Sequence, residues 1–344
     1  MLIVNGPVKD GEHEEAGHPE RPDRLIAALA GITDLHLGED LTVLPPYVAT
    51  RAELARVHHG SYLDELGAFC YAGGGNIDAD TYATYDSWSI ARYAAGAGLA
   101  VVNELRRRRS GIGFVAARPP GHHALADRAM GFCLLNNIAV AAAQLSSEGE
   151  RVLIVDWDVH HGNGTQSIFW NDPNVLYVST HQWPLFPGSG GSREIGGFEA
   201  IGGIINVPVP AGTTGDVLLR AFESIVAPAV AAFDPTWVLV SAGFDAHRGD
   251  PLADLALSSG DFADLARRVS QFAPRPGRLA LFLEGGYDLA ALRSSVAATL
   301  GALLESEWVP EESTSGGPGD EQVVRAGAER HIAMEMAYDS KPEE

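Results

Sequence analysis

Five short apolar runs recur along the chain, and each is nearly continuous rather than alternating. They cover residues 113–116, 152–155, 175–178, 237–240 and 279–283. Strands of a sheet that is covered on both faces have this pattern, because neither face meets water. Between the runs lie Ala- and Leu-rich stretches at helical spacing, over residues 87–109, 134–148, 216–232, 261–273 and 288–305. The alternation predicts a single-domain α/β fold with a mostly parallel central sheet and helices on both faces.

The regular pattern ends near residue 308. Residues 1–307 contain no internal repeat or linker, which predicts one domain over this range. Beyond it, a stretch of Ser, Thr, Gly and Pro is followed by charged residues and by an apolar patch around Ile332 to Tyr338. We expect residues 308–344 to form a polar C-terminal tail that is flexible or peripheral, or that serves as an oligomerisation element. Whether the protein forms a homo-oligomer therefore stays an open question.

The composition narrows the class of protein. Of the 344 residues, 46% are hydrophobic and 20% are charged, as in an ordinary globular domain. The net charge of −21 disfavours direct nucleic-acid binding, because phosphates require clustered cations. No apolar run approaches the ~18 residues of a membrane span, and residues 1–7 lack the features of a secretory signal. Since the chain has only two cysteines, Cys70 and Cys133, we expect a cytoplasmic protein that has no membrane contact.

Residues capable of chemistry follow every apolar run. They are His122 and His123 after the first run, Asp156, Asp158 and His160 after the second, Ser179 and His181 after the third, Asp245 after the fourth, and Tyr287 after the last. Ligands of open α/β sheets bind at the carboxyl ends of the strands. We therefore expect these side chains to meet along one edge of the sheet.

Asp158 and His160 are the clearest candidates for metal ligands. Because they are two residues apart on what should be an extended segment, their side chains would point to the same side. Asp245 would add a second carboxylate and leave positions open for water and substrate, as in catalytic rather than structural sites. Zn²⁺ is the first choice by ligand type, and Fe²⁺, Co²⁺ or Mn²⁺ could also be held. His161 would face the other way and serve the structure.

Seven strings of residues resemble motifs of the histone deacetylase family, and they occur in the family's order. They are His18–Arg24, Arg118–His123, Gly131–Asn136, Asp156–Gln166, Phe186–Gly190, Ser241–Pro251 and Glu284–Leu289, within roughly residues 12–305. The run Asp-Trp-Asp-Val-His-His-Gly-Asn-Gly-Thr-Gln is the most specific of them. The chain is most similar to the class II branch and its bacterial class II-like members, and this resemblance implies the arginase/deacetylase fold.

The resemblance implies two cation sites. Zn²⁺ would be held by Asp158, His160 and Asp245. A structural monovalent cation, K⁺, would lie near Asp156 and draw on Asp158, His160 and Ser179. Tyr287 would donate a hydrogen bond to the substrate carbonyl. Since some class II members carry His at the position of Tyr287 and act feebly on acetyl-lysine, this chain should be active.

The two neighbouring histidines should differ in charge. By resemblance, Asp156 orients His122, and Asn163 orients His123. A carboxylate partner favours the imidazolium form, whereas a neutral amide fixes the tautomer without stabilising positive charge. We therefore predict that His123 is the general base and acid of amide hydrolysis, and that His122 is mainly an electrostatic and positioning group.

A narrow acyl-lysine tunnel is also implied by the resemblance, with Phe132 and Phe186 as its walls and Gly131 beside them. Leu252 stands where polyamine-preferring relatives carry an acidic residue. This favours acetyl-lysine in a peptide or protein over an acetylated polyamine. Arg24 resembles the arginine that lines an internal acetate-release cavity. Residues 76–86 are expected to form a loop at the rim.

Two other function classes are open to this fold. Binuclear manganese ureohydrolases need further carboxylates at positions that Gly162 and His247 occupy here. A non-catalytic acyl-lysine binder would lack a metal ligand or a catalytic donor, and the sequence lacks neither. The metal content and the hydrolysis of an acetylated lysine peptide distinguish the three classes.

Overall fold

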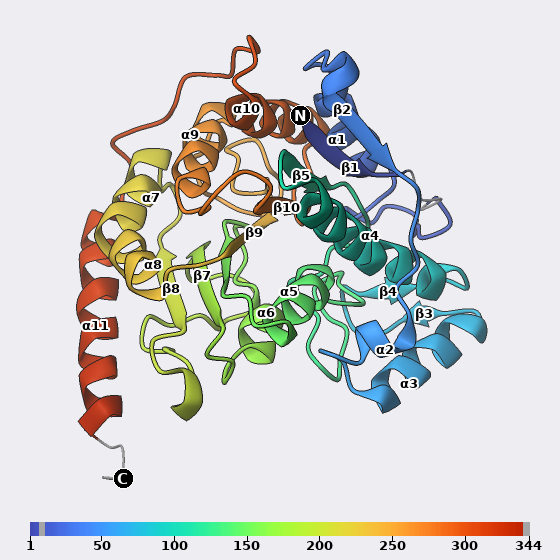
Figure 1. Cartoon of the computed structure of the whole chain (residues 1–344), viewed down its shortest axis with the longest axis horizontal. Helices are drawn as coiled ribbons and strands as arrows, with labels where there is room; N and C mark the ends of the chain where they lie inside the picture. The colour runs from blue at the N-terminus through green and yellow to red at the C-terminus, as the bar shows by residue number, and fades with distance from the viewer. Residues whose placement is uncertain (7–10, 340–344) are drawn as a thin grey trace.

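A parallel eight-stranded sheet forms the centre of the molecule (Figure 1). The structure, a computed structural model, describes residues 1–6 and 11–339. The sheet order is β2-β1-β5-β10-β9-β6-β7-β8. The strand bounds are β1 Leu2–Asn5, β2 Leu41–Leu44, β5 Ile112–Val115, β6 Val152–Asp156, β7 Val175–Gln182, β8 Ile204–Val209, β9 Trp237–Ala242 and β10 Leu279–Leu283. A separate antiparallel pair joins β3 (Gly75–Asn76) to β4 (Tyr82–Ala83).

Helices cover both faces of the sheet and create two apolar cores (Figure 1). One core receives α1 (Asp23–Thr33), α7 (Gly215–Ala221), α9 (Ser259–Ser270) and α10 (Leu289–Leu304), and the other receives α3 (Gly60–Tyr71), α4 (Ser87–Arg108) and α5 (Asn137–Ser147). Strand β6 shows why its sequence is continuously apolar. Leu153 and Val155 belong to the first core, and Val152 and Ile154 belong to the second. The predicted α/β fold is confirmed.

All five predicted strands and four of the five predicted helices are present. The fifth helical stretch, residues 216–232, is divided into α7, a π-helical turn (Phe222–Val226) and α8 (Ala227–Phe233). The turn lies just before Pro228, whose ring nitrogen has no proton for the helical ladder. The remaining α-helices of the described residues are α2 (Arg51–Leu54), α6 (Asn163–Ile168) and α11 (Asp320–Asp339).

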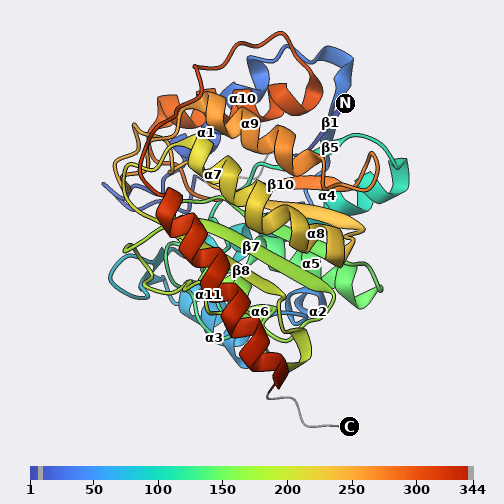
Figure 2. The same cartoon turned by 90° about the vertical axis from the view of Figure 1, so that its left-hand side faces the viewer.

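The C-terminal tail is attached to the domain rather than extended away from it. Thr314 Oγ1 donates to Asp261 Oδ2 (2.7 Å) and accepts from the Gly215 N–H (3.0 Å). Beyond it, α11 lies against β8 and α7 at the edge of the sheet (Figure 2). In this structure the segment from Thr314 to the end of α11 lies on the domain, and the predicted division into a domain and a tail at residue 307 stays a prediction. Residues 340–344 lie outside the described residues. No described helix combines the length and apolarity needed to cross a membrane.

Candidate active site at the carboxyl ends of the strands

The polar side chains predicted at the carboxyl ends of the strands lie close together there. The backbone after Asp156, however, is not extended as was expected. Strand β6 ends at Asp156, and the chain then bends instead of staying extended. Asp156 Oδ1 accepts from the Asp158 N–H (3.2 Å), and Asp158 Oδ1 accepts from the His160 N–H (2.9 Å). Aspartate side chains favour such turns by bonding to the backbone two residues ahead. The bends thus bring Asp158 and His160 together.

Asp158, His160 and Asp245 form a buried cluster whose potential ligand atoms all lie within 4.8 Å of one another. His160 Nδ1 is 3.2 Å from Asp158 Oδ1 and 3.2 Å from Asp245 Oδ2. Backbone N–H groups hold the carboxylates in place, with Gly285 donating to Asp158 Oδ2 at 2.8 Å and Val159 donating to Asp245 Oδ1 at 2.9 Å. Only glycine fits at position 285, because a Cβ there would stand 2.0 Å from Asp245 Oδ2.

The electrostatics of this cluster favour a bound cation. Burial and the neighbouring Asp158 raise the pKa of Asp245 to about 7. Burial opposes the charge of His160, but hydrogen bonds to Asp158 and Asp245 and their negative charges raise its pKa to about 10. Two carboxylates this close in a buried site require compensating positive charge. Two oxygens and one imidazole nitrogen suit a divalent metal with open coordination positions, so these residues fit such an ion.

The paired histidines have the partners that were predicted for them. His122 Nδ1 lies 3.0 Å from Asp156 Oδ2, and His123 Nδ1 lies 2.8 Å from Asn163 Oδ1. For His122, burial opposes the charge, but Asp158 and Asp156 raise the pKa to about 10. For His123, burial and the nearby His122 lower the pKa well below its usual value. At neutral pH the pair therefore combines a charged ring with a neutral one.

Tyr287 is positioned by one carboxylate and one guanidinium. Asp250 Oδ2 accepts from the Tyr287 N–H (2.6 Å), and the Arg24 guanidinium lies 4.7 Å from the centre of the Tyr287 ring. Arg24 also donates to the backbone oxygens of Glu284 and Gly286 and pairs with buried Glu20 (2.9 Å). Burial raises the pKa of the Tyr287 phenol well above its usual value, so the phenol keeps its proton.

Sequence reasoning missed Glu284 and Asp250 as supports of the site. Glu284 Oε2 accepts from the N–H groups of Gly121 (2.7 Å) and His122 (3.1 Å) and so fixes the backbone that carries the two histidines. Both residues lie within the strings that resemble family motifs. The signal in the sequence was a carboxylate directly after an apolar run, at Glu284. Its residue type alone does not indicate which groups it would bind.

A hollow of about 190 Å³ opens over the cluster. It is lined by Asp80, His123, Gly131, Phe132, His160, Leu185, Phe186, Leu252 and Tyr287. The Phe132 ring lies edge-on to Tyr287 with 5.7 Å between ring centres, and the Phe186 ring lies edge-on to His123 at 5.1 Å. All four residues predicted for the tunnel, Gly131, Phe132, Phe186 and Leu252, line this hollow. The predicted loop at the rim contributes Asp80.

Three further positions that the sequence singled out, Ser179, His161 and Gly162, lie close to the cluster or support it. Ser179 pairs with Asp156 across β6 and β7, and its hydroxyl contacts His181 Nδ1 at 2.9 Å. His161 bonds to Ser189 and Gln166, in agreement with the predicted structural role. At Gly162 a Cβ would stand 2.2 Å from Asp156 Oδ2, so no carboxylate side chain fits there. Within the described ranges, Asp158, His160 and Asp245 are the only group of three potential metal ligands.

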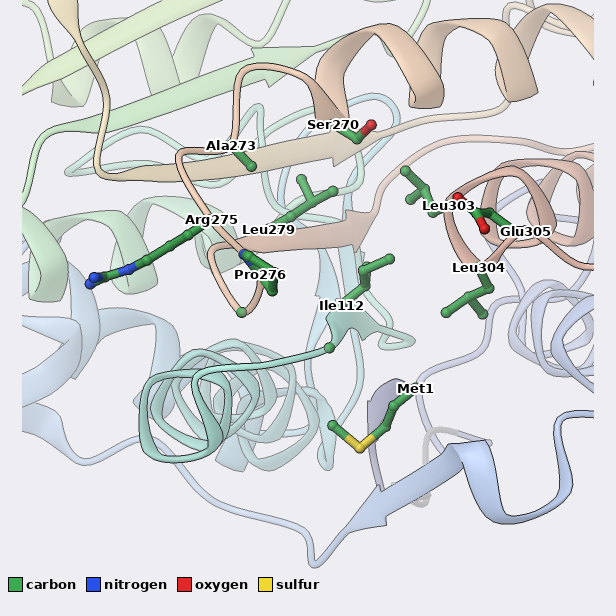
Figure 3. A pocket seen from close by; sticks show the side chains of 12 residues that line it. Met1, Ile112, Ser270, Ala273, Arg275, Pro276, Leu279, Leu303, Leu304 and Glu305 are labelled. Atoms are coloured by element: carbon green, nitrogen blue, oxygen red, sulfur yellow. The ribbon is translucent and has the colours of Figure 1, made fainter.

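A larger hollow of about 450 Å³ lies at the opposite end of the strands, beside the amino ends of β5 and β10 (Figure 3). Its walls include Met1, Ile112 and Leu279. None of its lining residues belongs to the candidate site. The chemistry is therefore concentrated at the narrower hollow.

Comparisons with known proteins agree with this picture. A model of the histone deacetylase domain matches residues 18–303. An uncharacterized protein of Synechocystis sp. is 41% identical over 298 residues, which cover 83% of this chain and 94% of the relative. A histone deacetylase-like amidohydrolase of Pseudomonas aeruginosa is 40% identical over 282 residues, with 80% and 74% covered. The crystal structure of the HDA15 HD domain superposes with a TM-score of 0.88 at 33% identity, and 99% of each chain is covered.

Proposed function

The chain belongs to the histone deacetylase family of amide hydrolases, and from this premise we propose that it removes acetyl groups from lysine side chains of peptides or proteins. The observation that carries the proposal is the cluster of Asp158, His160 and Asp245, whose His160 lines the same hollow as His123 and Tyr287. An amide is a poor electrophile with a poor leaving group. Its hydrolysis therefore needs an activated water, a proton donor and a stabilised oxyanion.

Asp158, His160 and Asp245 would hold one divalent ion, with Zn²⁺ first by donor type and Fe²⁺ or Co²⁺ as alternatives. Such an ion, when bound, lowers the pKa of water and polarises a carbonyl as a Lewis acid. Close to it, Asp156 and Ser179 face each other across two strands at the position proposed for a structural K⁺. Asp158 and His160 would contribute to that second site as well.

His123 is proposed as the group that moves protons. Burial and the neighbouring His122 lower the pKa of His123, so its ring remains neutral. Because Nδ1 faces Asn163, Nε2 can accept a proton from the attacking water. The same nitrogen then returns a proton to the departing amine. His122, charged through Asp156, would supply positive electrostatic potential and hold its neighbour in place.

Tyr287 is proposed as the donor to the oxyanion. Its buried phenol stays protonated and lines the same hollow as His123. Losing a donor of this kind typically costs about 10²–10³ in rate. The contacts of Arg24 support the Glu284–Tyr287 backbone directly, and a role of Arg24 in acetate release stays a prediction.

Acetyl-lysine is proposed over an acetylated polyamine because Leu252 lines the hollow with an apolar side chain. A carboxylate at that position would attract a second amine of the substrate, and Leu252 cannot provide that attraction.

A cytoplasmic site of action is proposed as well. It is supported by the two buried, unpaired cysteines, Cys70 and Cys133.

The deciding experiment compares turnover of an acetyl-lysine peptide with that of acetylputrescine, before and after metal removal. We expect peptide hydrolysis that disappears with a chelator and returns when about one equivalent of Zn²⁺ per chain is restored. A preference for acetylputrescine above about tenfold would reverse the substrate order. Binding of the peptide without hydrolysis by the metal-loaded protein would instead indicate an acyl-lysine binder.

A further inference from the structure

A second hollow, of about 320 Å³, lies beside the proposed tunnel. Three segments form its walls: Tyr62, Glu65, Leu66 and Phe69 from α3, Asn76 and Ile77 at the end of β3, and Asp127, Arg128 and Ala129 from the loop after the paired histidines. This volume is at the lower end of the range for ligand pockets, and it is enough for part of a ligand. None of these residues has a place in the chemistry proposed above.

Two independent segments border both hollows. The segment 127–132 places Ala129 in the second hollow and Gly131 in the first. The hairpin β3–β4 places Ile77 in the second and Asp80 in the first. Because consecutive Cα atoms are ~3.8 Å apart, Ala129 and Gly131 are separated by no more than roughly 8 Å. The two hollows are therefore neighbours on the surface.

Hydrogen bonds fix the shared wall. The Phe132 N–H donates to Thr81 Oγ1 (3.2 Å) and joins the two segments. The Ile77 N–H donates to the Thr81 carbonyl (2.7 Å), and the Tyr62 hydroxyl donates to the Leu134 carbonyl (2.5 Å). The second hollow is thus formed before any substrate binds, which lowers the entropic cost of binding.

The lining combines apolar depth with negative charge at the surface. Leu66 and Ala129 are buried and Phe69 and Ile77 are half-buried, whereas the carboxylates of Glu65 and Asp127 are exposed. Neither carboxylate forms an ion pair within the described part of the chain, and Asp78 adds a third carboxylate one residue from Ile77. Arg128 is the single cation of the lining. The remaining charge favours a cationic group on an apolar stem.

We propose that this hollow receives a Lys or Arg side chain of the peptide substrate, two or three residues from the acetylated lysine. An extended peptide advances ~3.3–3.6 Å per residue, so a side chain two or three residues from the acetylated lysine can reach a hollow whose wall is formed by the same two segments. The methylene stem contacts Leu66, Phe69 and Ile77, and the charged end lies between Glu65 and Asp127. The inference rests on the proposed deacetylase function and names the class of peptide that the enzyme selects.

The test measures kcat/KM for acetyl-lysine peptides that carry Arg, Leu or Asp singly at positions −3, −2, +2 and +3. We expect Arg to exceed Leu by about threefold to tenfold at one or more positions, because exposed ion pairs are individually weak. In the double variant Glu65→Gln/Asp127→Asn the Arg-to-Leu ratio should fall below about twofold. The ratio within one variant cancels any loss of folded protein.

A matched control removes the same number of charges elsewhere. Glu39 and Glu307 are exposed carboxylates far along the chain from both hollows, and Glu39→Gln/Glu307→Gln should keep the wild-type ratio. Equal rates for Arg and Leu in the wild-type enzyme, a preference for Leu, or an Arg preference that survives in the double variant would each overturn the inference. If the wild-type enzyme hydrolyses no peptide and no free acetyl-lysine, the proposed function fails, and the inference fails with it.

Discussion

The two neighbouring histidines of the site differ in their acceptors and in their charged neighbours, and their proposed roles follow from these differences. Nδ1 of His122 faces a carboxylate oxygen, and Nδ1 of His123 faces an amide oxygen. The negative charges of Asp158 and Asp156 raise the pKa of His122 despite its burial, whereas burial and the neighbouring His122 lower the pKa of His123. A base must be neutral before it can accept a proton, and at neutral pH only His123 meets this condition.

Substitution of His123 by Ala should lower the turnover of an acetyl-lysine peptide to less than about a tenth of wild type, because proton transfer is typically worth ~10²–10⁴ in rate. The measurement is kcat for the metal-loaded protein, with metal content determined alongside. A His123→Ala protein that binds metal normally and keeps more than about a tenth of its turnover contradicts the assignment of the base.

The lowered pKa of Glu20 predicts how the free energy of unfolding depends on pH. This buried carboxylate lies between Arg118 (2.5 Å) and Arg24 (2.9 Å). Burial opposes its charge, but the two guanidinium groups lower its pKa to about 2, below the ordinary 4.5. A lowered pKa in the folded state stabilises the fold above about pH 4.5, and this contribution is lost as the pH falls toward 2.

The variant Glu20→Gln should therefore be less stable than wild type at pH 7, by about 3–5 kcal/mol, because it leaves two buried guanidinium groups without their carboxylate. Between about pH 4.5 and pH 2 the difference should shrink, since the wild-type carboxylate becomes protonated. Urea unfolding at several pH values measures it. A difference that stays constant over that range would show that the charge of Glu20 does not contribute.

Residue chemistry could be predicted where a side chain acts on a ligand, but not where it supports the backbone. Asp158, His160 and Asp245 follow apolar strands, and their ligand chemistry suggests a common partner. Glu284 and Asp250 bind backbone N–H groups, which every residue offers, so nothing in the sequence identifies their partners. The left-handed backbone of Phe132 (φ 67°) is equally invisible in sequence.

At the scale of elements, strands buried on both faces were predictable and edge strands were not. Central strands such as β6 are continuously apolar because each face enters a core. The edge strand β8 contains Asn206 and Pro208, and a proline is tolerated there because one side of an edge strand forms no ladder. The other edge strand, β2, is only partly buried along its four residues, so its sequence lacks the pattern of a covered strand.

The turn at Gly131 gives an element-scale prediction. Its φ of 56° and the 2.5 Å that would separate a Cβ from His123 Cδ2 leave room for glycine alone. Gly131→Ala should displace His123 or Phe186 and reduce kcat/KM by more than about tenfold, since small displacements of reacting groups are costly. Gly188→Ala is the matched control, because Gly188 also has a positive φ (83°) but has open space around it. Equal losses in the two variants would assign the effect to backbone strain.

At the scale of the whole molecule, the C-terminal segment completes the surface of the domain. Helix α11 lies against β8, an edge strand of the sheet, and edge strands without cover invite aggregation. Upstream of the helix, Glu311 contacts His247 (3.0 Å) and binds Arg248, which precede the Asp250 that holds Tyr287. The tail thus reaches from the sheet edge to the loop beside the site.

Neighbouring valines of α11 test whether this docking contributes to stability. Val323 is 5% exposed and Val324 is 74% exposed, so one substitution places the same charge on either side of the helix. Val323→Asp should destabilise the protein by about 2–4 kcal/mol, because it buries an unpaired carboxylate or forces the helix to detach. Val324→Asp should change the stability by less than about 0.5 kcal/mol. Thermal and urea unfolding measure both variants, and indistinguishable midpoints would mean that α11 does not dock on the sheet edge in solution.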